Sequence, residues 1–138
     1  MDAKELMIDD WVRIVEPSKY AGAIGRIKTL RDHKDEENAY FKVFLRNNTI
    51  HIGIEDICSE DIRPIPLTTE ILVKNGFKDY DSFATLDTEK YRVIYAFDGF
   101  ITIVDDDNQR KVSYLECDDV HVLQHAMRIC GIEKEIKV

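Results

Sequence analysis

The stretch DDWVRIVEPSKYAGAIGRI, residues 9–27, decides how the first half of the chain is interpreted. Apolar residues alternate in WVRIV (residues 11–15) and again in IGRIKTL (residues 24–30), as they do in half-buried strands. Pro17 and Gly22 lie between the two segments and are typical of a turn. The stretch therefore predicts the first hairpin of a β-sheet.

The pattern continues beyond a charged, aperiodic run, RDHKDEEN (31–38), which we expect to be a loop. YFKVFLR (40–46) alternates, and Asn47 and Asn48 tolerate the backbone conformations of a tight hairpin. The returning strand TIHIGI (49–54) carries three isoleucines on one face: Ile50, Ile52 and Ile54. These segments predict two further strands.

A turn in EDICSED (55–61) is expected to lead into a last short strand, IRPIP (62–66). Five short strands with one apolar face each indicate a small closed β-barrel, because closure removes the exposed edges of a sheet. Residues 1–66 are therefore expected to form a β-barrel domain.

The second half changes its hydrophobic period. A short helix is expected over residues 70–75, capped by Thr68 or Thr69 and ended by Gly76. Three antiparallel strands are expected next, with Asp98-Gly99 as the first turn and DDDNQ (105–109) as the second. Their segments are YRVIYAF (91–97), FITIV (100–104) and RKVSYLE (110–116).

A second helix is expected over residues 119–130, capped by Asp118 and ended by Gly131. The tail IEKEIKV (132–138) suits a terminal edge strand with Ile132, Ile136 and Val138 on one side. The fold class expected for the chain is α+β: a barrel in residues 1–66 packed with an α-β-β-β-α unit in residues 67–138, joined by the stiff connector RPIPL as one rigid body.

Composition limits the classes of function. The 138 residues are 44% hydrophobic, but no apolar run approaches the roughly 20 residues of a membrane-spanning helix. The start MDAKELMIDD lacks the basic and apolar regions of a signal peptide, and the three cysteines suit reduced thiols, so we expect a cytoplasmic protein. The net charge of −8 disfavours nonspecific binding to nucleic acid by the whole surface.

Six positions of the opening stretch resemble the KOW motif of some ribosomal proteins and transcription elongation factors: Asp10, Val12, Ile14, Gly22, Gly25 and Ile27. The resemblance covers about twenty residues and implies an SH3-like barrel. Asp9 stands where the motif often has glycine.

Most of the chain also resembles a group of short uncharacterised proteins of gut bacteria and their mobile elements, in IRPIPLTTEILVKNGF (62–77) and VHVLQHAMRICGIEKEI (120–136). This second resemblance implies no activity.

A basic and aromatic face is the first candidate site. If alternate residues of the barrel strands point inward, the remaining ones point outward: Arg13, Arg26, Lys28, Tyr40, Lys42, Phe44 and Arg46. Rings between cations are suited to stack bases and bind phosphates of a single-stranded nucleic acid. The alternative is that the second half of the chain covers Tyr40 and Phe44.

His121 and His125 are the second candidate, because histidines four residues apart on a helix can bind one zinc ion. Cys117 lies four residues before His121, ahead of the expected helix start. The helical pattern favours Val120, Leu123 and Met127 as the buried face and the two histidines as a polar face. We therefore expect no metal and no cofactor.

Catalytic motifs are missing: the chain has no Gly-rich phosphate loop and no GxSxG. We therefore expect a non-enzymatic interaction protein whose partner is another protein. The first alternative is binding to a nucleic acid or ribonucleoprotein through the basic and aromatic face. The second is an acidic mimic of DNA from a mobile element, which predicts that Asp105, Asp106, Asp107, Glu116, Asp118 and Asp119 cluster on one side.

Overall fold

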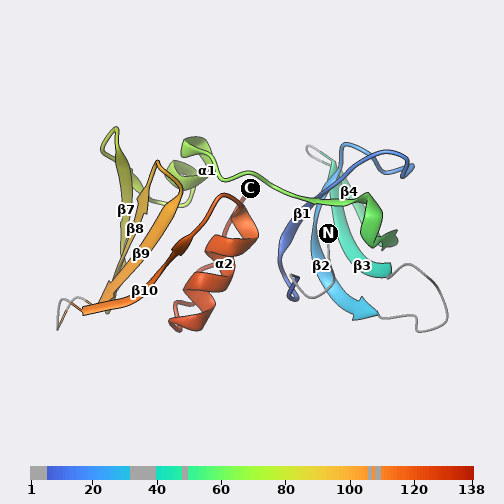
Figure 1. Ribbon diagram of the computed structural model, residues 1–138. Helices are drawn as coiled ribbons and strands as arrows, with labels where there is room; N and C mark the ends of the chain where they lie inside the picture. The colour runs from blue at the N-terminus through green and yellow to red at the C-terminus, as the bar shows by residue number, and fades with distance from the viewer. Residues whose placement is uncertain (1–5, 32–39, 48–49, 106, 108–109) are drawn as a thin grey trace. The chain divides into compact units, whose positions relative to one another are not determined.

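The computed structural model describes residues 6–31, 40–47, 50–105, 107 and 110–138. The fold is mixed and mostly β, with two antiparallel sheets and two α-helices in this part of the chain (Figure 1). The chain divides into two compact units, Met1–Ile65 and Pro66–Val138, and each contains one five-stranded sheet. Within the described ranges, no helix has the length and apolar character needed to cross a membrane.

The first sheet has the strand order β4-β3-β2-β1-β5. Its strands are β1 (Trp11–Ile14), β2 (Ile24–Arg31), β3 (Tyr40–Asn47), β4 (Ile50–Cys58) and β5 (Ile62–Pro64). The predicted strands are all present, but the turn in EDICSED is shorter than predicted. β4 continues to Cys58, and only the short 3-10 helix η2 (Ser59–Asp61) separates it from β5.

This sheet is strongly curled, but the prediction of a closed barrel is not confirmed. β4 and β5 are the outermost strands, and no pairing joins them in the described residues. In a flat sheet these strands would lie about 19 Å apart, which is four strand spacings. The chain nevertheless passes from Cys58 to Ile62 through η2 alone. The sheet must therefore bend until its two edges approach each other at this corner.

The inner face of the curled sheet holds the apolar core of the first unit. On β1, Val12 and Ile14 are buried while Arg13 is exposed, as the alternation predicts. The core consists of Leu6, Val12, Ile14, Ala23, Ile27, Phe41, Val43, Leu45, Ile57 and Ile62. A Cβ atom at Gly25 would lie 2.6 Å from Cγ1 of Val43, so glycine permits the close approach of β2 and β3.

Two isoleucines of β4, Ile52 and Ile54, do not face this core. Ile52 and Ile54 are 37% and 55% exposed, whereas Ile57 is buried. The register shifts between Leu45 and Arg46, so that Leu45 lies opposite Gly53 and Phe44 opposite Ile54. Because opposite residues point to the same side of a sheet, Ile54 shares the outer face with Phe44.

The second sheet has five strands, where the sequence predicts three, in the order β10-β9-β8-β7-β6. They are β6 (Lys78–Asp79), β7 (Phe83–Asp87), β8 (Tyr91–Ala96), β9 (Phe100–Asp105) and β10 (Arg110–Glu116). β6 has only two residues, both exposed. β7 does alternate, with Ala84 and Leu86 buried, but the exposed Phe83 hides this pattern in the sequence. Figure 1 shows α2 along one side of this sheet.

Both predicted helices are present. The helix α1 (Thr69–Lys74) begins at Thr68, whose hydroxyl accepts a hydrogen bond from the Ile71 amide, and Gly76 follows it with φ +89°. The helix α2 (Val120–Ile129) begins after Asp119 rather than Asp118, and the Asp119 side chain makes no capping hydrogen bond. The predicted cap is therefore wrong.

The terminal segment 132–138 is not a strand, which corrects the predicted terminal edge strand. The side chain of Asn75 binds it instead. Its Nδ2 donates to the Lys137 carbonyl and its Oδ1 accepts from the Lys137 amide, both at 2.7 Å. One side-chain amide thus supplies the pair of hydrogen bonds that a neighbouring strand would give, while Ile132 and Ile136 are buried.

Candidate interaction surface

The outer face of the first sheet, the face turned away from its apolar core, carries a row of side chains across four strands. The register places Trp11 opposite Arg26, Arg26 opposite Phe44, and Phe44 opposite Ile54. Directly opposite residues point to the same side of an antiparallel sheet. The row therefore runs from β1 to β4 as aromatic, basic, aromatic and aliphatic.

Trp11 also belongs to this face, although it is not among the binding residues predicted from the sequence. The same alternation that turns Arg13 outward also turns Trp11 outward, so the signal was present in WVRIV. The ring is only 7% exposed. The guanidinium carbons of Arg26 and Arg46 each lie 5.4 Å from its centroid, which is cation–π distance. Two of the predicted binding cations thus contact an aromatic ring of the same face.

Lys28 occupies a bulge, because the pairing of β2 with β3 shifts between Ile27 and Thr29. Its Nζ lies 3.6 Å from Oδ1 of Asp9 and 5.8 Å from the centroid of the Phe44 ring. The ion pair is partly exposed, so it adds little to stability. It does hold the Lys28 side chain above this face.

The other predicted residues lie on the same face. Arg13 is exposed and diagonal to Arg26 on the neighbouring strand. Lys42 lies opposite Asp56 on β4, and Tyr40 lies opposite Cys58 at the start of β3. The fold therefore gathers the predicted basic residues on one side of the sheet.

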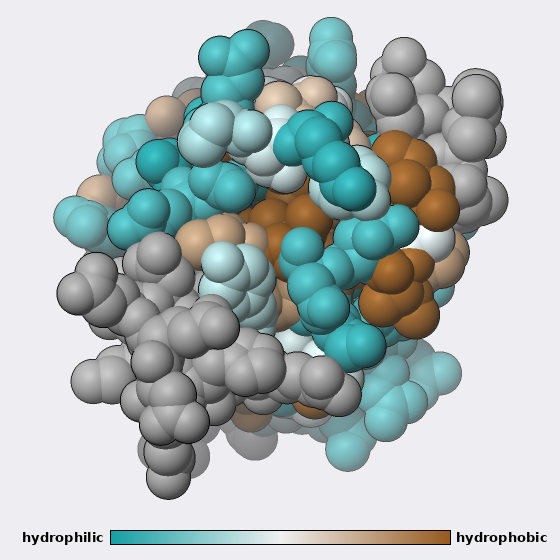
Figure 2. All heavy atoms as spheres, turned by 90° about the vertical axis from the view of Figure 1, so that its right-hand side faces the viewer, coloured by the Kyte–Doolittle hydropathy of each residue, from teal (hydrophilic) through white to brown (hydrophobic). Residues whose placement is uncertain are grey.

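Exposed apolar groups lie beside these cations. Ile54 and Ile52 are exposed on β4, and Phe44 is half-buried on β3. Figure 2, which looks onto the first unit, shows hydrophobic side chains at the surface among hydrophilic ones. A patch of this kind, with an apolar centre and a charged rim, is typical of a protein interface. We call Phe44, Ile52 and Ile54 the apolar centre of the outer face.

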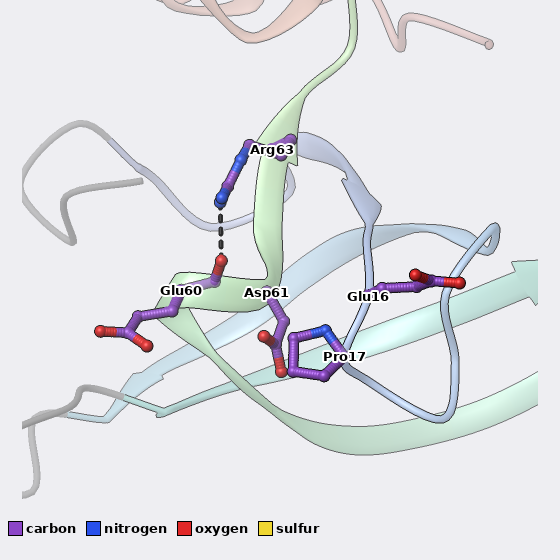
Figure 3. Close-up of a pocket in the computed structure, with 5 residues that line it drawn as sticks. All are labelled: Glu16, Pro17, Glu60, Asp61 and Arg63. Carbon is purple, nitrogen blue, oxygen red and sulfur yellow. Dashed lines mark hydrogen bonds between the residues drawn. The ribbon is translucent and has the colours of Figure 1, made fainter.

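A second feature of the first unit is an open depression between the β1–β2 connection and β5 (Figure 3). It is lined by Glu16, Pro17, Glu60, Asp61 and Arg63. Arg63 donates from Nη1 to the backbone carbonyls of Glu60 and Ile62. In Figure 3 the carboxylates of Glu16 and Glu60 point in opposite directions. These carboxylates do not converge on one point, as the ligands of a cation would.

The histidines of α2 contact each other rather than forming a polar face. The rings of His121 and His125 are 5.6 Å apart and nearly perpendicular. His121 is buried, which corrects the prediction that it lies on a polar face, while Ile129 is 82% exposed. No group of three His, Cys, Asp or Glu residues within the described part of the chain is placed to hold a metal ion.

Burial, together with the charges of Asp119 and Asp118, raises the pKa of the Cys117 thiol to about 12. A thiol with so high a pKa stays protonated at neutral pH. Cys117 is therefore poorly suited to act as a nucleophile or a metal ligand.

The acidic residues proposed to imitate DNA lie at two ends of one hairpin. Asp105 ends β9 and Asp107 follows it, whereas Glu116 ends β10 and lies opposite Phe100 at the start of β9. Phe100 and Asp105 are five residue steps apart along β9, so the two groups are separated by about 17 Å. Asp118 and Asp119 follow Glu116, and Asp106 lies outside the described residues. The acidic residues of the hairpin therefore do not form the single cluster that a mimic of DNA would need.

Comparison with known proteins identified no matching family model, no matching curated protein and no matching solved structure.

Proposed function

We propose that this protein is a non-enzymatic interaction protein, and that the outer face of its first sheet docks on another protein. The observation that carries the proposal is the pairing of Phe44 with the 55% exposed Ile54 among basic residues. The apolar surface of an exposed isoleucine beside a half-buried ring is removed from water only when a partner covers it.

The first unit is proposed to be an SH3-like barrel. The strand order, with β1 between β2 and β5, supports this assignment, as does the short helix η2 that joins the two outermost strands. The strong curl that η2 imposes brings the sheet close to a barrel. The sequence resemblance to the KOW motif in residues 9–27 points to the same fold.

A protein is favoured over a nucleic acid as the partner because of how the rings are placed. Trp11 is 7% exposed beneath two arginines, so a base cannot stack on it without moving them. The apolar centre is mainly aliphatic, and Ile52 and Ile54 offer no flat surface for a base. The net charge of −8 also opposes a polyanion.

The charge of the face defines the chemistry of the partner. Five basic and two acidic residues surround the apolar centre: Arg13, Arg26, Lys28, Lys42 and Arg46, with Asp9 and Asp56. A complementary surface would present an apolar protrusion with an acidic rim. We therefore propose an acidic protein surface as the ligand of the apolar centre.

The test is affinity capture from a bacterial lysate with three versions of the full chain: wild type, Ile54→Asp and Val73→Asp. Val73 is a matched control because it is 51% exposed on α1, outside the first sheet. A captured acidic protein that is lost with Ile54→Asp and kept with Val73→Asp, with or without nuclease, supports the proposal. A partner retained equally by both variants overturns it.

The nucleic-acid alternative predicts a different result. Purified protein would bind RNA or DNA with a steep dependence on salt, because phosphate contacts release counterions. The double variant Arg26→Glu with Lys28→Glu would abolish that binding, while Ile54→Asp would leave it nearly unchanged. This outcome would identify the partner as a nucleic acid rather than a protein.

A further inference from the structure

The long edge strand of the second sheet, β10, is a surface separate from the outer face of the first sheet. In the described residues β10 pairs only with β9, so its other side presents free backbone N–H and C=O groups. The opposite edge, β6, has only two residues, whereas β10 has seven. Strand addition to this sheet is therefore possible along β10.

β10 also exposes apolar side chains, which soluble proteins usually avoid on an edge. Tyr114 is 59% exposed and Val112 is 49% exposed. The Tyr114 ring stacks on Phe100 of β9, with centroids 5.3 Å apart and planes 7° apart. The stacked pair forms a rigid apolar surface beside the free backbone groups. We call Val112 and Tyr114, with this backbone, the β10 edge.

The charges along the β10 edge indicate what binds it. Lys111 lies near the start of the strand, with its Nζ 5.1 Å from the centroid of the Tyr114 ring, and Glu116 ends the strand. A strand that is basic at one end and acidic at the other is complementary to an antiparallel copy of itself. The geometry points to a homodimer in which β10 pairs with β10 of a second copy.

Pairing of the opposite charges at the two ends of β10 sets the register of the dimer. The pairing with β9 shifts between Lys111 and Ser113, so Lys111 and Val112 together occupy one position of the ladder. With Tyr114 on the two-fold axis, that position lies opposite Glu116 of the second copy. The symmetry repeats the pair, so two Lys111–Glu116 pairs flank two adjacent Tyr114 rings.

The dimer is expected to be weak. One strand from each copy buries less than the roughly 1,000 Å² that stable interfaces exceed. The association should therefore be visible only at high protein concentration. Analytical ultracentrifugation of the full chain from about 10 µM to about 1 mM covers the corresponding range of affinity. The expected result is a reversible shift from the monomer mass to twice that mass.

Charge reversal gives the decisive test because the proposed interface is symmetric. Lys111→Glu alone and Glu116→Lys alone each place like charges together twice, and each should weaken the association by about tenfold or more. An equimolar mixture of the two variants restores opposite charges at both pairs and should dimerise like wild type. Rescue by mixing cannot result from changes within one chain.

Tyr114→Lys should abolish the dimer, since it places two cations at the axis, whereas Ile129→Lys should leave it intact. Ile129 is the matched control because it is also strongly exposed but lies on α2. A monomer mass throughout the concentration range would overturn the proposal. Dimers that are lost in both single variants but not restored by mixing them would overturn it as well.

Discussion

The guanidinium group of Arg26 lies 5.4 Å from the centre of the Trp11 ring, directly across the β1–β2 pairing. Both side chains project from the outer face of the first sheet, yet the ring is almost fully buried. The aliphatic part of an arginine covers apolar surface while its charged head meets solvent. Arg26 therefore protects an outward-facing tryptophan and remains part of a basic surface.

Removing this cover should be visible in the fluorescence of Trp11, which is the only tryptophan of the sequence. Arg26→Ala with Arg46→Ala should shift the emission to longer wavelength and increase quenching by acrylamide. Two lost cation–π contacts should lower the free energy of unfolding by about 1 to 2 kcal/mol. The control is Arg13→Ala, an exposed residue of the same face, whose emission should equal that of wild type. Unchanged quenching in the double variant would contradict the proposed cover.

Truncation of two isoleucines of β4 should change the free energy of unfolding by very different amounts. Ile57 is 2% exposed in the core, so Ile57→Ala should lower the free energy of unfolding by about 2 to 5 kcal/mol. Ile54 is 55% exposed, so Ile54→Ala should change it by less than about 0.5 kcal/mol. Urea unfolding of both variants measures the difference. Equal losses would mean that Ile54 is buried and unavailable to a partner.

Asn75 should anchor the terminal segment. Asn75 is 4% exposed, and its side chain hydrogen-bonds both the carbonyl and the amide of Lys137. Asn75→Ala should therefore lower the free energy of unfolding by about 1 to 3 kcal/mol. Hydrogen exchange at the Lys137 amide should become faster, because the Asn75 oxygen that accepts from it is gone. Asn75→Asp keeps that acceptor but loses the donor to the Lys137 and Ile71 carbonyls, so its amide exchange should change less. Identical exchange in wild type and Asn75→Ala would disprove the anchor.

Cys117 should make stability depend on alkaline pH. Burial, with Asp119 and Asp118, raises the pKa of its thiol in the folded protein from 9.0 to about 12. Between these values the unfolded chain loses the proton while the folded protein keeps it, so stability falls as pH rises from 9 towards 12. The difference in unfolding free energy between wild type and Cys117→Ala, measured by urea at several pH values, isolates this group from other alkaline titrations. A difference that stays constant with pH would contradict the raised pKa.

Part of the candidate surface could be predicted from local pattern. Alternation in residues 11–15 and 24–30 places Arg13 and Arg26 outward, because successive side chains of a strand point to opposite faces. The same rule assigns Trp11 to that face, although its low exposure depends on arginines from two other strands. The isoleucines of β4 were harder to place, since a bulge near Arg46 changes the register at that end of the strand.

Local sequence patterns predicted the segments of both helices and of eight of the ten strands in the described part of the chain, because hydrophobic periods, capping residues and turn residues act over a few neighbouring positions. Only the three-dimensional structure showed that β7 and β6 extend the second sheet, that Asn75 replaces a strand for the terminal segment, and that Ile52 and Ile54 of β4 are exposed while Ile57 is buried. The Asn75 contact joins residues 62 positions apart in the chain, and the placement of Ile52 and Ile54 depends on the register shift between β3 and β4. A local pattern carries no information about which distant strand or side chain completes a hydrogen bond.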